Sequence, residues 1–173
     1  MSIDDLKNSI RDIHDFPHKG IIFKDITPVL QDKELFKYSI GLLVEKVKEI
    51  NPDFICGIES RGFIFGSAVA LELNKGFVPV RKPGKLPHDT FKMKYELEYG
   101  SNILEIHKDA FFKEARVVII DDLLATGGTA KASAKLVEAC GAIVVQILFL
   151  IELSFLKGRE ALKGYLTDTI LRY

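Results

Sequence analysis

The stretch VVIIDDLLATGGTA, residues 117–130, decides the fold. Its first four residues are apolar and β-branched, which predicts a short strand over 117–120 that is buried on both faces. The Ala-rich residues 129–140 predict a helix, and Gly141 predicts where that helix stops. Residues 143–151 are again apolar and predict another strand. This strand, helix, strand order is typical of a parallel sheet covered by helices.

The same order occurs earlier in the chain. From their apolar spacing, strands are predicted over 54–58 and 77–80, and helices over 32–51 and 62–73. We therefore expect an α/β fold, with a mostly parallel central sheet and helices on both faces. Ligands of such sheets bind beyond the carboxyl ends of the strands. The turns after Ile58, Val80 and Ile120 are thus the places where a site is expected.

Length and composition limit what the chain can be. Its 173 residues suit a single domain over 1–173, and no repeat or linker divides them. The 24 basic residues balance the 24 acidic ones, which argues against a nucleic-acid partner held by a basic face and against a membrane held by a polybasic one. The acidic start predicts no secretory signal and the apolar runs are too short for a membrane span, so we expect a cytoplasmic protein.

The cysteines and histidines do not predict a metal site. Cys56 and Cys140 form no CxxC pair, and both are predicted to lie in the core. The four histidines lack the spacing of a metal cage. No residue is therefore assigned as a direct metal ligand.

Residues 125–129, Ala-Thr-Gly-Gly-Thr, are predicted to bind a phosphate monoester. Gly127 and Gly128 let backbone N–H groups approach an anion, Thr126 and Thr129 add hydroxyl donors, and the positive end of the next helix points at the same place. The chain has neither GxxxxGK[ST] nor GxGxxG, which argues against nucleoside triphosphate and dinucleotide sites.

The adjacent acids Asp121 and Asp122 suit hydroxyl groups beside that phosphate. Carboxylates accept hydrogen bonds from the vicinal diol of a ribose, and they can help to hold a hydrated magnesium ion. The alternative is a solvated strand end with a helix cap.

The segment 117–130 resembles the signature of the type I phosphoribosyltransferases, which bind 5-phosphoribosyl-1-pyrophosphate (PRPP) and exchange its pyrophosphate for a nitrogenous base. Blocks between about residues 16 and 160 resemble the branch of the family that takes adenine: FKDITP at 23–28, ESRGF at 59–63, RKPGKLP at 81–87 and LEYG at 97–100. The resemblance implies a small amino-terminal cover, a flexible lid loop, Mg²⁺ bound mainly through PRPP, a homodimer, and AMP and pyrophosphate as products.

The resemblance also implies which residues form the site. Glu98 would be the acid or base that exchanges a proton with the purine, and Arg61 would act on the pyrophosphate. Pyrophosphate contacts would come from Lys82 and Lys85, and from Glu59 and Ser60, which a cis peptide bond would join. Ribose would contact Asp121 and Asp122, and the 5′-phosphate would contact Ala125, Thr126, Gly127, Gly128 and Thr129. The base would contact Ile22, Phe23, Lys24 and Leu123, with Tyr99 as a further substrate contact.

Several alternatives stay open. Arg61 could be a surface helix cap, and Phe23 an ordinary core residue. Residues 82–102 could be a lysine-bearing lid or an edge hairpin, because 90–95 alternate polar and apolar side chains. The acceptor could be a 6-oxopurine, or the chain could be a noncatalytic sensor of a phosphoribosyl ligand.

Overall fold

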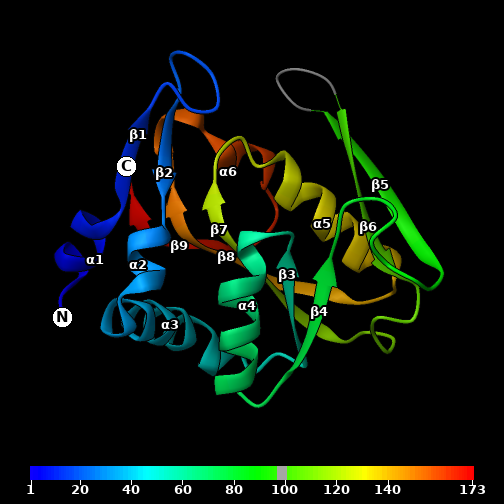
Figure 1. Cartoon of the computed structure of the whole chain (residues 1–173). Coiled ribbons are helices and arrows are strands. Elements are labelled where there is room, and N and C mark those ends of the chain that lie inside the picture. Colours follow the sequence, from blue (N-terminus) through cyan, green and yellow to red (C-terminus); the bar gives the residue numbers. More distant parts are fainter. Residues whose placement is uncertain (97–100) are drawn as a thin grey trace. The chain divides into compact units, whose positions relative to one another are not determined.

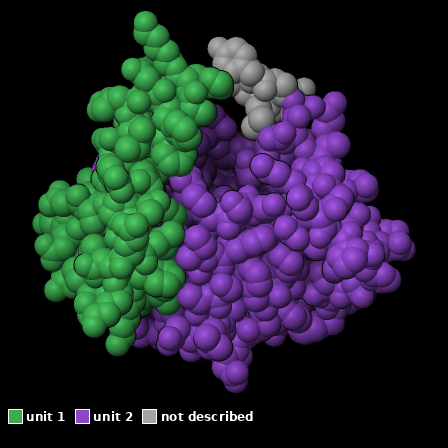
Figure 2. All heavy atoms as spheres, in the orientation of Figure 1, with its two compact units in different colours: residues 1–42 green, residues 43–173 purple. Residues whose placement is uncertain are grey.

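The computed structural model describes residues 1–96 and 101–173. The chain divides into two compact units, residues 1–42 and 43–173, which Figure 2 shows in different colours. That 1–173 form a single domain stays a prediction. None of the helices in the described ranges combines the length and hydrophobicity that a membrane span needs.

The first unit holds two short helices and a hairpin. Helix α1 (Ile3–Ser9) starts with a capping box, in which the Ser2 hydroxyl accepts from the Asp5 N–H and the Asp5 carboxylate accepts from the Ser2 N–H. Strands β1 (Arg11–His14) and β2 (Ile22–Asp25) pair antiparallel, and α2 (Thr27–Gln31) follows them. The sequence did not predict this hairpin.

Helix α3 (Lys33–Val47) and the 3₁₀ turn η1 (Lys48–Ile50) confirm the helix predicted over 32–51. The boundary between the two units falls within α3.

The second unit is built on a five-stranded sheet in the order β4-β3-β7-β8-β9, with every neighbouring pair parallel (Figure 1). The strands are β3 (Phe54–Ile58), β4 (Gly76–Val80), β7 (Arg116–Leu124), β8 (Ile143–Glu152) and β9 (Thr167–Arg172). The helices are α4 (Arg61–Glu72), α5 (Gly128–Ala139) and α6 (Gly158–Ala161), with a 3₁₀ turn η2 (Ser154–Leu156) before α6. The predicted α/β fold and its parallel sheet are confirmed.

The core explains why these strands are so uniformly apolar. Val117 and Ile119 of β7 pack in one buried cluster with Leu136 of α5. Val118 and Ile120 alternate with them along the strand, so their side chains point to the opposite face, and they too are fully buried. Helix α4 packs along β3 and β7. A strand buried on both faces has no position for a solvated side chain until its end.

Within residues 82–102, the described residues from 90 onward belong to a hairpin. Strands β5 (Thr90–Glu96) and β6 (Ser101–His107) pair antiparallel, with Phe91 opposite Ile106, and β5 packs along α5. The hairpin alternative is therefore confirmed for these strands. Whether the segment closes as a lid stays a prediction, and residues 97–100, with Glu98 and Tyr99, lie outside the described residues.

Two expectations need correction, and one strand was missed. Strand β7 does not end at Ile120: Asp121 pairs with Phe149 and Leu124 with Glu152, so the predicted turn at 121–124 is strand. Cys56 is buried in the core as predicted, but Cys140 is only partly buried at the end of α5. Strand β9 was not predicted, because its residues TDTILR form neither a continuous apolar run nor a regular alternation of polar and apolar side chains.

Candidate active site

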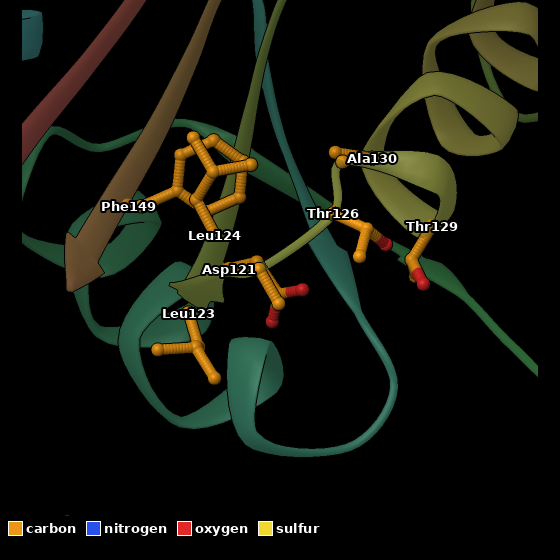
Figure 3. A pocket seen from close by; sticks show the side chains of 9 residues that line it. Asp121, Leu123, Leu124, Thr126, Thr129, Ala130 and Phe149 are labelled. Carbon is orange, nitrogen blue, oxygen red and sulfur yellow. The ribbon is translucent and has the colours of Figure 1, made fainter. Parts of the chain in front are cut away.

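The phosphate loop, residues 125–129, joins the buried end of β7 to α5 (Figure 3). Gly127 has a φ of 84° and caps α5 without any side-chain hydrogen bond. The backbone N–H of Lys131 donates to the carbonyl of Gly127 at 2.9 Å. The backbone N–H groups of the residues that precede Lys131 in the first turn of α5 have no acceptor within that helix. The loop thus offers an anion both free donors and the positive end of a helix.

A pocket of about 80 Å³ opens at this loop. Its lining is Asp121, Leu123, Leu124, Ala125, Thr126, Gly127, Thr129, Ala130 and Phe149. Figure 3 shows the hydroxyl groups of Thr126 and Thr129 beside each other at the start of α5, with the Asp121 carboxylate on the same side. The Thr129 hydroxyl also donates to the hydroxyl of Tyr95 on β5 at 3.3 Å. Sequence reasoning missed Tyr95, which connects the hairpin to the phosphate loop.

The two acids at the end of β7 differ in their partners. The N–H of Asp122 donates to Oδ1 of Asp121 at 2.9 Å, and Nη2 of Arg61 lies 2.9 Å from Oδ2 of Asp122. Burial raises the pKa of the Asp121 carboxyl well above its ordinary value, and the neighbouring charge of Asp122 raises it further. Burial also raises the pKa of Asp122, although the Arg61 guanidinium opposes that rise. Two neighbouring acids, one half-buried and one buried, favour a ligand that donates hydrogen bonds or carries positive charge.

The turn between β3 and α4 contains Glu59 and Ser60, and the peptide bond between them is cis. The resemblance implied this bond, and the structure has it. Ser60 is exposed and caps α4 without a side-chain hydrogen bond. Oε2 of Glu59 accepts from the N–H of Lys82 at 2.8 Å and lies 3.4 Å from Nε of Arg81. Glu59 thus fixes the start of the next predicted loop.

That loop, Arg81–Lys85, carries the exposed side chains of Lys82 and Lys85. Nη1 of Arg81 donates to the Lys85 carbonyl at 3.1 Å, which closes the loop on itself.

Glu105 on β6 holds the same loop. Its side chain is almost fully buried, Oε2 accepts from the N–H of Gly84 at 3.2 Å, and Oε1 lies 2.8 Å from Nζ of Lys92. The hydrogen bond from Lys92 lowers the pKa of Glu105 against the opposing effect of burial. Sequence reasoning missed Glu105, although an acid between the apolar residues Leu104 and Ile106 was a usable signal.

The residues predicted to contact the base lie in different parts of the chain. Ile22, Phe23 and Lys24 are in β2 of the first unit, where the Phe23 ring packs edge-on to Phe16 at 5.2 Å and Nζ of Lys24 donates to Asp12 at 2.6 Å. Phe23 is only partly buried. Leu123 is in β7 and lines the pocket at the phosphate loop.

The described residues contain no group of three His, Cys, Asp or Glu side chains that could hold a metal ion. Asp121 and Asp122 nevertheless offer the carboxylate oxygens that Mg²⁺ prefers, although Oδ2 of Asp122 already faces Nη2 of Arg61 at 2.9 Å. Two carboxylates fit an ion whose other ligands come from water and from a substrate.

Comparisons with known proteins agree with one another. A family model described as "Phosphoribosyl transferase domain" matches residues 26–165. The adenine phosphoribosyltransferase of Caldanaerobacter subterraneus subsp. tengcongensis is 57% identical over 173 residues, which is all of both chains. The crystal structure of the adenine phosphoribosyltransferase from Thermoanaerobacter pseudethanolicus superposes with a TM-score of 0.98 at 55% identity, over 99% of this chain and 100% of that one. The enzyme of the same name from Saccharomyces cerevisiae, solved with an imino-altritol bisphosphate and adenine, gives 0.93 at 42% identity, over 98% of each chain.

Proposed function

This chain belongs to the phosphoribosyltransferase family, and from that premise we propose that it transfers phosphoribose from PRPP to adenine. The bond between C1′ and the pyrophosphate oxygen breaks, a bond between C1′ and N9 forms, and the N9 proton leaves. The products are AMP and pyrophosphate. The observation that carries the proposal is the phosphate loop, which places Thr126, Gly127 and Thr129 at the start of α5 with Asp121 beside them.

The phosphate loop would bind the 5′-phosphate of both PRPP and AMP, through the hydroxyls of Thr126 and Thr129 and the N–H groups from Ala125 to Thr129. Charge-assisted hydrogen bonds of this kind contribute about 1.5–3 kcal/mol each. Asp121 and Asp122 would accept hydrogen bonds from the ribose hydroxyls. Because the phosphate and the hydroxyls are held together, C1′ would be fixed in place for the transfer.

The pyrophosphate would contact Arg61, Lys82, Lys85 and the turn at Glu59 and Ser60. The positive charges of Arg61, Lys82 and Lys85 would stabilise the leaving pyrophosphate, on which negative charge grows as its bond to C1′ breaks. The contacts of Glu59 and Glu105 with the backbone of Arg81–Lys85 support this proposal, since they hold the loop that carries both lysines.

The base would contact Ile22, Phe23 and Lys24 and, from β7, Leu123. An apolar slot with backbone hydrogen bonds favours a 6-amino purine when the 6-oxo analogue leaves a donor or acceptor unpaired. Glu98 would exchange the proton with the purine, and Tyr99 would contact the substrate. Resemblance to the family supports the roles proposed for Glu98 and Tyr99.

Mg²⁺ would bind mainly through PRPP and would neutralise charge on the pyrophosphate. Asp121 and Asp122 would hold water molecules of such an ion. We further propose that the protein is a cytoplasmic homodimer, as the resemblance implies. Size-exclusion chromatography with light scattering tests the dimer.

One assay separates the proposed function from its rivals. The purified protein is incubated with Mg²⁺, PRPP and one purine at a time: adenine, guanine, hypoxanthine or xanthine. We expect AMP and pyrophosphate from adenine only. Product from guanine, hypoxanthine or xanthine, with none from adenine, would favour a phosphoribosyltransferase for 6-oxopurines. Binding of PRPP without product from any base would favour a sensor.

A further inference from the structure

We propose that Arg159 is a positioning residue for the 5′-phosphate: by tying α6 to Glu152, it holds Gly158 against Gly127 and keeps the phosphate loop in its binding conformation. The inference rests on the proposed function, because it concerns the same loop.

The first step is the contact between the loop and the start of α6. A Cβ atom at Gly127 would collide with the carbonyl oxygen of Gly158, and a Cβ atom at Gly158 would collide with the carbonyl oxygen of Ala125. Nearby, the N–H of Leu153 donates to the carbonyl of Leu124 at 2.9 Å. The two backbones touch with no room for a side chain, so a shift of Gly158 would be transmitted to Gly127.

The second step is that α6 needs an anchor. It has four residues, and the residue before it, Lys157, has a φ of 52°. A single helical turn is unstable by itself, because nucleation fixes several backbone angles for one hydrogen bond. The position of Gly158 must therefore be set by contacts from outside the helix.

Arg159 makes those contacts. Its Nε donates to Oε1 of Glu152 at 2.9 Å, and its Nη2 donates to Oε2 at 2.8 Å, which is a bidentate ion pair. Its Nη1 donates to the carbonyl of Thr167 at 2.7 Å. Glu152 is 5% exposed, and it also accepts from the hydroxyl of Thr169 at 3.2 Å. One guanidinium thus fixes α6 to both β8 and β9.

A matched control lies at the same carboxylate. Nε of Arg172 is 3.4 Å from Oε2 of Glu152, but Arg172 is on β9 rather than on α6, and its side chain is 63% exposed. Loss of Arg172 removes a cation from Glu152 and leaves the anchor of α6 intact.

The experiment measures binding of AMP, and separately of pyrophosphate with Mg²⁺, by isothermal titration calorimetry. In Arg159→Met we expect the Kd for AMP to rise about tenfold, equivalent to one charge-assisted hydrogen bond. The Kd for pyrophosphate should not change, because its proposed contacts are elsewhere. Arg159→Lys, which keeps the charge but not the fork, should recover part of the AMP affinity. Arg172→Met should bind both ligands as the wild type does.

Equal AMP affinity in Arg159→Met and wild type would overturn the inference, and so would parallel losses for AMP and pyrophosphate or an equal loss in Arg172→Met. If Arg159→Met does not fold, Arg159→Lys decides on the same terms: a selective loss of AMP binding supports the inference, and any other result overturns it. If the wild type bound no AMP, both the proposed function and this inference would fail. If the wild type bound AMP but the variants did not behave as expected, only this inference would fail.

Discussion

Arg61 and Asp122 form an ion pair, with Nη2 of the arginine 2.9 Å from Oδ2 of the aspartate. The pair connects the start of α4 to the end of β7. It therefore joins the cation proposed to bind pyrophosphate to an acid proposed to bind ribose. Asp122 is 4% exposed, so its charge depends on this partner.

Removing Arg61 should reduce both stability and activity. In Arg61→Met the buried Asp122 charge loses its partner, and we expect the free energy of unfolding to fall by about 2 kcal/mol. The loss of a cation on the leaving group should lower kcat/KM by about 10²-fold. Urea denaturation and steady-state assays measure the two effects.

The double variant Arg61→Met with Asp122→Asn separates these effects. It removes both charges, so most of the lost stability should return while the activity stays low. Recovery of activity together with stability would show that Arg61 acts only on Asp122 and not on the substrate.

Gly127→Ala should abolish phosphate binding as well as destabilise the protein. The left-handed backbone at Gly127 disfavours a side chain by about 1–2 kcal/mol, and the new methyl group would also meet the Gly158 carbonyl. Gly141→Ala is the control, since Gly141 has a φ of 78° and no atom within 4 Å of an added Cβ. Both variants should lose stability in thermal unfolding, and only Gly127→Ala should lose AMP binding. Similar AMP affinities in the two would contradict a binding function for the loop.

Glu98→Leu tests the proposed proton exchange. We expect a folded protein with wild-type AMP affinity and a kcat lower by about 10²-fold or more, because general acid–base catalysis contributes that much. Glu96→Leu, the same change two residues away, should keep its kcat. An unaltered kcat in Glu98→Leu would remove Glu98 from the mechanism.

Glu105 should stabilise the protein in a pH-dependent way. Lys92 and the Gly84 N–H lower the pKa of this carboxyl in the folded state below its ordinary value of 4.5. A lowered folded-state pKa gives stability that is present above the unfolded pKa and is lost as the pH falls through the folded one. The difference in free energy of unfolding between wild type and Glu105→Gln should therefore be largest near neutral pH and should shrink in acid below 4.5. A difference that is constant with pH would contradict this account.

The sequence predicted four of the five strands of the sheet, because short apolar runs of β-branched residues such as 117–120 are typical of strands buried on both faces. It placed the end of β7 wrongly, since Asp121 and Asp122 were predicted to form a turn although both lie in the strand and Asp121 pairs with Phe149. The phosphate loop was predictable from the local chemistry of Gly127 and the threonines. Glu105, Tyr95 and Arg159 were not predicted, because the contacts that give them their roles join separate strands and helices and depend on how those elements pack.

The contact between Gly127 and Gly158 has a consequence for synthesis of the chain. After the ribosome has made residues 117–130, it must add roughly thirty more residues before Gly158 is in the chain. This takes about 2–6 s at ordinary translation rates. A nascent chain that ends before Gly158 would carry the whole motif and still lack the packing that shapes it. Nascent chains stalled before and after that residue should therefore differ in their ability to retain the nucleotide product.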